Sequence, residues 1–138
     1  MTKEFLFEFI RQHKLAVVST ISPGNFSQSA LVGIAVTENL EIIFDTVKNS
    51  RKYKNISVNR TVSVVIGWEN ETTVQYEGEA TELAGENADH FREIYFSAFP
   101  DGRERFEKWE GLVHFKISPK WIRYSNFDAP QEIQEMNF

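Results

Sequence analysis

The side chains in this sequence best suited to chemistry lie in one short basic segment, Lys48 to Arg60. The segment holds five of the chain's fifteen basic side chains and none of its twenty acidic ones. Ser50, Arg51 and Lys52 stand where a short helix is predicted to begin, so free backbone N–H groups and the positive helix end would reinforce the two cations. A hydroxyl, a planar bidentate donor and a mobile point charge suit a phosphate monoester better than a carboxylate. The spacing predicts an anion site, and the alternative is an ordinary solvated amphipathic helix.

The remaining reactive side chains lack the spacing of a catalytic or metal site. Three histidines, His13, His90 and His114, are far apart and have no carboxylate or second histidine at ligand spacing, so we expect no metal site. The strand serines have no sharp strand-to-helix turn of the kind that presents a nucleophile. The glutamate pairs have strand or turn spacing and are expected to face water.

Composition limits the other classes of function. With 138 residues, 41% hydrophobic and 25% charged, the chain is predicted to form one soluble domain over residues 1–138. A net charge of -5 argues against nucleic acid as the main partner. The sequence has no cysteine, which excludes thiol chemistry and favours the cytoplasm. Glu4, Glu8 and Arg11 interrupt the N-terminal apolar stretch, so it is not a signal peptide and we expect neither export nor a membrane anchor.

The elements that would position the basic segment are mostly strands. Period-two runs and turn clusters predict strands over 15–21, 26–36, 40–46, 61–68, 72–85 and 112–124, and helical periodicity predicts helices over 2–14, from 49 or 50 onward, and over 86–99. The tail from 125 has no clear period. This mainly β pattern with peripheral helices favours a six-stranded antiparallel Greek-key barrel, which also removes exposed strand edges.

Three stretches of the sequence resemble a known family. The runs IIFDTVKNSRKYKNISVNRTVSVVIGW, TVQYEGEATEL and VHFKISPKWIRYSNF are similar to the FMN-binding split-barrel proteins related to pyridoxamine 5'-phosphate oxidase, including small members like the general stress proteins. The resemblance covers most of the chain. It implies a split barrel that binds FMN, with the flavin phosphate held by Thr46, Ser50, Arg51 and Lys52.

The resemblance also implies where the rest of the flavin lies. The backbone of the second strand would pass along the isoalloxazine ring, which here means Ser29, Ala30, Leu31 and Val32. A polar side chain at the start of the fifth strand would touch the flavin, and the sequence offers Thr73 first and Gln75 second. The family site spans a two-fold interface, so a homodimer is expected, with Trp109, Trp121 or Arg123 as candidates to complete the site from the second subunit.

The function implied by the resemblance is that of an FMN-dependent oxidoreductase of unknown substrate, acting with a small-molecule electron donor or acceptor. Three alternatives stay open: a non-enzymatic flavin-binding stress protein, a member that binds deazaflavin F420, and a haem binder with His114 as ligand. Pyridoxamine-phosphate oxidase itself carries a further C-terminal region absent here, so that specific activity is not expected. Asp45 stands beside the basic segment, where its charge would oppose an anion unless the side chain turns away.

Overall fold

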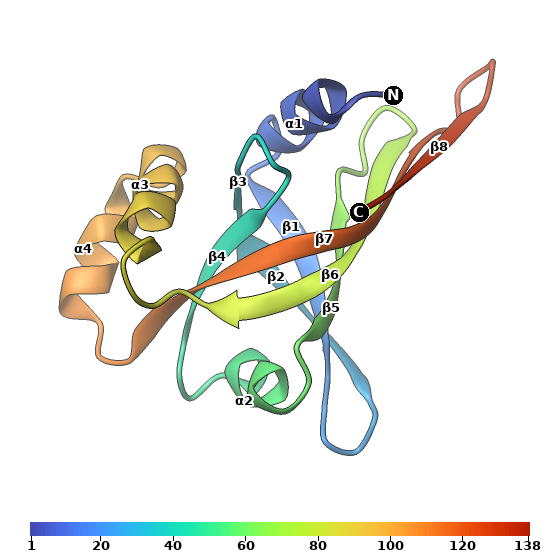
Figure 1. Ribbon diagram of the computed structural model, residues 1–138. Coiled ribbons are helices and arrows are strands. Elements are labelled where there is room, and N and C mark those ends of the chain that lie inside the picture. Colours follow the sequence, from blue (N-terminus) through green and yellow to red (C-terminus); the bar gives the residue numbers. More distant parts are fainter.

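The computed structural model describes residues 1–138 and shows a strongly curled antiparallel sheet with four helices around it (Figure 1). The strands are β1 (Leu15–Ile21), β2 (Ser27–Gly33), β3 (Ala35–Val36), β4 (Ile42–Val47), β5 (Thr61–Ile66), β6 (Thr72–Glu82), β7 (Leu112–Asn126) and β8 (Glu132–Asn137). The helices are α1 (Lys3–Arg11), α2 (Arg51–Val58), α3 (Ala88–Ala98) and α4 (Asp101–Lys108). The strands follow the order β2-β1-β5-β6-β7-β4-β3, and β8 pairs with β7.

Period-two alternation builds the core of the barrel. In β5, Val62, Val64 and Ile66 are buried while the residues between them are exposed. Tyr76 lies deep in this core and its hydroxyl donates to the backbone carbonyls of Leu40 at 2.7 Å and Ile117 at 3.1 Å. Burial of alternate apolar side chains therefore leaves one face of each strand for the barrel interior and one for the outside.

The predicted mainly β barrel is confirmed, but the strand count of six is wrong and one helix was missed. The predicted strand 26–36 bends after Gly33, where the Ile34 N–H turns to the Lys14 carbonyl, and becomes β2 and β3. The tail forms β8, because pairing with β7 and not its own periodicity orders it. Helix α4 is almost entirely polar, and Phe106 is the side chain that packs it against the second apolar cluster.

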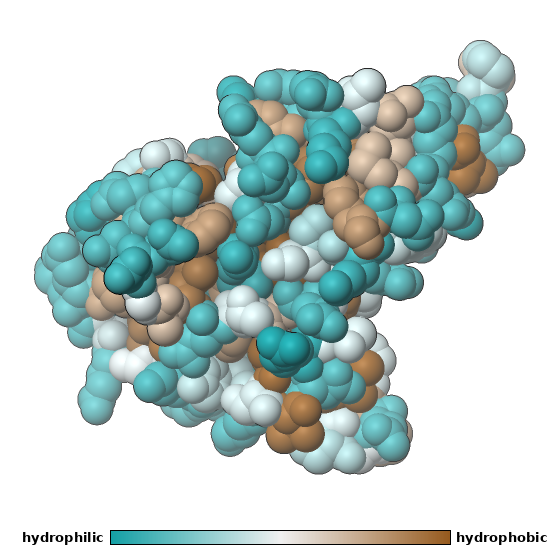
Figure 2. All heavy atoms as spheres, viewed as in Figure 1, coloured by the Kyte–Doolittle hydropathy of each residue, from teal (hydrophilic) through white to brown (hydrophobic).

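The helices cover different parts of the sheet. Helix α2 lies at the end of the barrel against β1 and β4, while α3 and α4 form a pair on another side (Figure 1). Hydrophilic side chains dominate the face shown in Figure 2, and hydrophobic ones appear as separate patches. No helix is long and apolar enough to span a membrane.

Candidate functional site

The start of α2 is built by two hydroxyl side chains. Ser50 is the N-cap, and its oxygen accepts hydrogen bonds from the Tyr53 backbone N–H at 3.1 Å and from the Thr46 hydroxyl at 2.9 Å. Capping of this kind satisfies one of the free backbone donors of the first helical turn. Because both bonds are accepted by the Ser50 oxygen, its own hydroxyl hydrogen stays free to donate. The sequence left Asn49 and Ser50 open as the start of this helix, and the structure shows that the N-cap is Ser50.

A small cavity lies beside this helix start, between α2 and the strands β1 and β2. Its volume is about 110 Å³, and it is lined by Thr20, Gln28, Ser29, Ala30, Arg51 and Lys52. A water molecule takes about 30 Å³ of liquid, so the cavity suits a group of the size of a phosphate and not a flat ring system. No carboxylate belongs to the lining. The cavity therefore combines two cations with neutral polar groups.

Three residues of this region were missed by the sequence reasoning: Asn55, Thr20 and Gln28. The side-chain amide of Asn55 donates to the Thr20 hydroxyl oxygen and to the Gln28 amide oxygen, both at 2.9 Å. The signal for Asn55 was present, because an asparagine in the interior of a short helix has poor helix propensity and needs another reason to be there. Nothing local in the sequence marks its two partners.

The charges around the cavity favour an anion. Partial burial lowers the pKa of Lys52, and the neighbouring Arg51 lowers it further, while Asp45 opposes the shift. Asp45 itself turns toward α4, where Arg105 lies 3.3 Å from its carboxylate. The Asp45 charge, which the sequence placed next to the predicted anion site, is thus paired with Arg105.

The structure brings only some of the predicted site residues to the cavity. Ser29, Ala30, Arg51 and Lys52 line it, and Thr46 and Ser50 are linked to each other by a hydrogen bond at the helix start. Further along β2, the Leu31 side chain is exposed and that of Val32 is buried in the core. Thr73 and Gln75 lie on β6, separated from β2 by β1 and β5, so one chain alone does not bring them to this cavity.

The outer face of the sheet carries an exposed apolar row. Leu31 pairs with Val17, Val17 with Val65, and Val65 with Gln75, each on the adjacent strand. Leu31 is 61% exposed and Val65 is 41% exposed. Apolar side chains gathered on the open face of a sheet are typical of a surface that another protein covers.

The residues predicted to complete the site from a second subunit occupy two places. Trp109 is exposed at the end of α4. Trp121 donates to Glu135 at 3.2 Å, and Arg123 pairs with the same carboxylate, which holds both side chains against β8. Trp109 is therefore the one of the three that has no such intrachain hydrogen bond.

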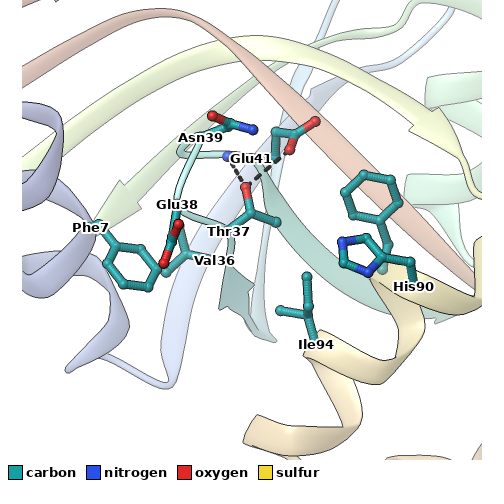
Figure 3. A pocket seen from close by; sticks show the side chains of 9 residues that line it. Phe7, Val36, Thr37, Glu38, Asn39, Glu41, His90 and Ile94 are labelled. Atoms are coloured by element: carbon teal, nitrogen blue, oxygen red, sulfur yellow. Dashed lines mark hydrogen bonds between the residues drawn. The ribbon is translucent and has the colours of Figure 1, made fainter. Parts of the chain in front are cut away.

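Larger hollows lie elsewhere. Two adjoining pockets of about 430 and 370 Å³ share Phe7, Val36 and Ile94 between α1 and α3. Figure 3 shows the first, where Thr37 hydrogen-bonds to Glu41. A third, of about 570 Å³, lies over the outer ends of β1 and β5 and is lined mainly by hydroxyl and amide side chains, with one carboxylate. None of these three includes Arg51 or Lys52.

His114 on β7 is fully buried under α3 and α4. Its ring packs against Tyr95, Phe96 and Phe106 with centroids 5.1, 5.6 and 5.3 Å away, and neither ring nitrogen has a hydrogen-bond partner. Burial lowers the pKa of His114 to about 4. None of the four pockets described above is lined by this ring. As the chain is folded here, a haem could reach His114 only if the two helices moved.

A family model described as pyridoxamine 5'-phosphate oxidase matches residues 2–126. No curated protein matches the chain. Solved structures with this fold include a heme binding protein from Mycobacterium smegmatis (TM-score 0.83, 10% identity, 99% of this chain and 58% of that one), Campylobacter jejuni ChuZ (0.77, 15%, 98% and 58%) and General Stress Protein 26 from Bacillus anthracis (0.71, 20%, 97% and 98%). The chain thus spans little more than half the length of the first two.

Proposed function

Since this chain belongs to the pyridoxamine 5'-phosphate oxidase family, we propose that it binds FMN, with the flavin phosphate in the small cavity at the start of α2. One observation carries the proposal: Arg51 and Lys52 line a phosphate-sized cavity that contains no carboxylate. The free hydroxyl hydrogen of Ser50 adds a further donor beside them. This donor set fits a phosphate monoester.

Each of these side chains has a distinct part in binding. Arg51 would hold two phosphate oxygens with its planar guanidinium, and Lys52 would supply a compact charge that partial burial keeps less screened by water. Thr46, which we expected to touch the phosphate, is buried and donates to Ser50. We therefore assign Thr46 to orienting the Ser50 hydroxyl.

The ring of the flavin is proposed to lie outside the cavity, along β2. This strand stands at the end of the sheet order and pairs only with β1, so its other edge has backbone N–H and C=O groups free for a ligand. Small side chains at Ser29 and Ala30 allow a flat ring to approach that backbone. Leu31 and Val32 continue the same edge.

We propose that the protein is a homodimer and that the outer sheet face is the subunit contact. The exposed row that includes Leu31 and Val65 supports this, because it continues directly from β2. In a two-fold assembly a residue distant from its own cavity can approach that of the other subunit. Thr73, Gln75 and the exposed Trp109 are proposed to complete the site in that way.

When bound, FMN would supply hydride chemistry at its N5 atom, and the protein would bind and orient it. We propose an oxidoreductase that uses a small-molecule electron donor or acceptor. The rival is a flavin-binding protein without turnover, and steady-state oxidation of NAD(P)H by the loaded protein separates the two. A single domain over residues 1–138 and a cytoplasmic location stay predictions from the sequence.

Haem is the second candidate ligand, and His114 is the observation that favours it. An imidazole with both nitrogens unpartnered could ligate iron, and one structure with this fold is a heme binding protein. The closed aromatic surroundings of His114 and the phosphate-type donor set at α2 favour FMN over haem. Deazaflavin F420 would use the same edge of β2 and differs from FMN in absorption.

The test is the visible absorption of the purified protein with added FMN, F420 or haemin. We expect tight uptake of FMN and a loss of at least about a hundredfold in affinity for the Arg51→Ala, Lys52→Ala double variant, because two charged hydrogen bonds are removed. Lys54→Ala, on the exposed side of the same helix, is the matched control. Equal FMN affinity in the double variant and the control would contradict the proposed phosphate site.

A further inference from the structure

Asn55 is a polar residue held inside the fold by α2. It is 3% exposed, and its side-chain N–H groups donate to Thr20 on β1 and to Gln28 on β2, at 2.9 Å in each case. Both amide hydrogens of Asn55 are therefore used inside the protein. The two residues that accept them line the small cavity, whereas Asn55 is not part of the lining.

The Thr20 hydroxyl is left with an unused donor. Thr20 is 1% exposed, its oxygen accepts from Asn55, and its own hydrogen has no acceptor within the protein. A buried polar hydrogen without a partner carries a free-energy cost. Because this hydroxyl belongs to the cavity lining, a bound group with a free acceptor oxygen would remove that cost.

Gln28 also keeps unused hydrogen-bond donors. Its amide oxygen is the atom that accepts from Asn55, so the free end of the carboxamide is the NH₂ group. An NH₂ group can only donate. The lining of the cavity then carries donors from Thr20 and Gln28 in addition to the cations of Arg51 and Lys52.

We propose that Asn55 is a positioning residue that fixes Thr20 and Gln28 as hydrogen-bond donors and so makes the cavity selective for a terminal phosphate over a neutral hydroxyl. The inference rests on the proposed function, since it concerns the same site. A phosphate monoester presents three acceptor oxygens and can use several donors at once. The terminal hydroxyl of riboflavin offers only one oxygen, so Asn55 governs the preference for FMN over riboflavin.

The decisive variant is Asn55→Asp, which has nearly the same shape and the opposite hydrogen-bonding polarity. A carboxylate would accept from Thr20 and Gln28 and turn their donors away from the cavity. We expect the affinity for FMN to fall by at least about tenfold, as for lost hydrogen bonds to a charged group, and the affinity for riboflavin to change by less than about twofold. Isothermal titration calorimetry with each flavin measures the ratio of the FMN affinity to the riboflavin affinity, called the FMN-to-riboflavin ratio below.

Two further variants separate this effect from added charge and from damage to the fold. Asn59→Asp places the same charge at the end of the same helix and keeps the acceptor for the Thr61 backbone N–H, so it should leave the FMN-to-riboflavin ratio close to that of the wild type. Gln28 is half-buried, and Gln28→Met removes its donors without adding a charge. This variant should lower the ratio of FMN affinity to riboflavin affinity even if Asn55→Asp does not fold.

The outcomes distinguish this inference from the proposed function. If the wild type binds FMN but Asn55→Asp and Gln28→Met keep its FMN-to-riboflavin ratio, the role of Asn55 is wrong and the flavin site stands. If the wild type binds no flavin, inorganic phosphate is the probe. A rise in melting temperature with phosphate that Gln28→Met abolishes would support the Thr20 and Gln28 donors as part of a phosphate site and would contradict flavin as the ligand. Absence of binding to FMN, riboflavin and phosphate overturns both.

Discussion

The Asp45 carboxylate and the Arg105 guanidinium lie 3.3 Å apart, and this ion pair joins β4, the strand that precedes α2, to helix α4. Both side chains are largely buried, at 17% and 22% exposed, so their charges are only weakly screened by water. Arg105 also contacts Asp101 at 2.7 Å. Arg105 on α4 therefore offsets part of the Asp45 charge that acts on Lys52.

Replacing Arg105 should weaken FMN binding from a distance. In Arg105→Gln the Asp45 carboxylate loses its cationic partner and opposes the phosphate more strongly, by about 1 kcal/mol or up to about fivefold in affinity. Titration with FMN at low and high salt measures this, and the difference should shrink at high salt. Arg103→Gln, which removes an exposed pair with Glu93, is the control and should leave binding unchanged.

The affinity for FMN should fall at alkaline pH sooner than for an ordinary lysine site. Burial and Arg51 lower the pKa of Lys52 from its usual 10.5, so this cation loses its proton at a lower pH than a solvated lysine. In the proposed site the phosphate binds the protonated form of Lys52, and the dissociation constant should therefore rise with pH as Lys52 titrates. Lys52→Arg should give a flat profile over the same range, because arginine stays charged. A pH profile of the wild type that is already flat would contradict this role.

His114 should make the fold less stable in mild acid. Its pKa is about 4 when folded and 6.5 when exposed, so between these values the unfolded chain binds more protons and stability falls as the pH drops from about 6.5 to about 4. The loss is on the order of 3 kcal/mol at 1.36 kcal/mol per pKa unit. His114→Phe should remove most of this dependence, measured by urea unfolding at pH 7 and pH 5.

The same variant should be at least as stable as the wild type at pH 7. It replaces two unpartnered ring nitrogens with carbon inside an aromatic cluster, and such a change is often neutral or stabilising. His90→Phe, at an exposed position on α3, is the control and should keep the acid dependence. A large loss of stability in His114→Phe at pH 7 would show that the nitrogens have a partner in solution.

The exposed row on the sheet gives a test of assembly. Val65→Asp places a charge in the middle of the proposed subunit contact and should raise the dissociation constant of the proposed dimer by at least about tenfold. Light scattering after gel filtration measures the mass. Val58→Asp, at an exposed valine on α2, should leave the mass unchanged. If the wild type is already a monomer, the proposal that Thr73 and Gln75 contact the flavin of a second subunit is wrong.

Gly78 should resist any side chain. It sits at the register shift between β6 and β7, and a Cβ there would overlap the backbone carbonyl oxygen of Ser118. Since backbone cannot move as a flexible side chain does, Gly78→Ala should destabilise the fold by about 2 kcal/mol or more, measured by urea unfolding. Gly24→Ala, where the added Cβ makes only an ordinary 3.4 Å contact with Phe26, should change stability by less than about 0.5 kcal/mol.

Local sequence patterns predicted much of the chemistry of the candidate site. The helix start at Ser50 and the cations after it follow from local rules of capping and charge, because the groups involved lie within a few residues of one another. The alternating strands likewise predicted a barrel, since burial of one face needs only period two. The number of strands did not follow, because β8 is ordered by its neighbour β7.

The cavity itself was decided by tertiary structure. Thr20 and Gln28 meet Asn55 across 35 and 27 residues of sequence, and no local pattern encodes which strand end a helix will cover. The same holds for Asp45, whose charge looked unfavourable until the fold brought Arg105 to it over 60 residues. Sequence determined which groups could bind an anion, whereas the packing of α2 and α4 on the barrel decided which of their donors are free and which charges are neutralised.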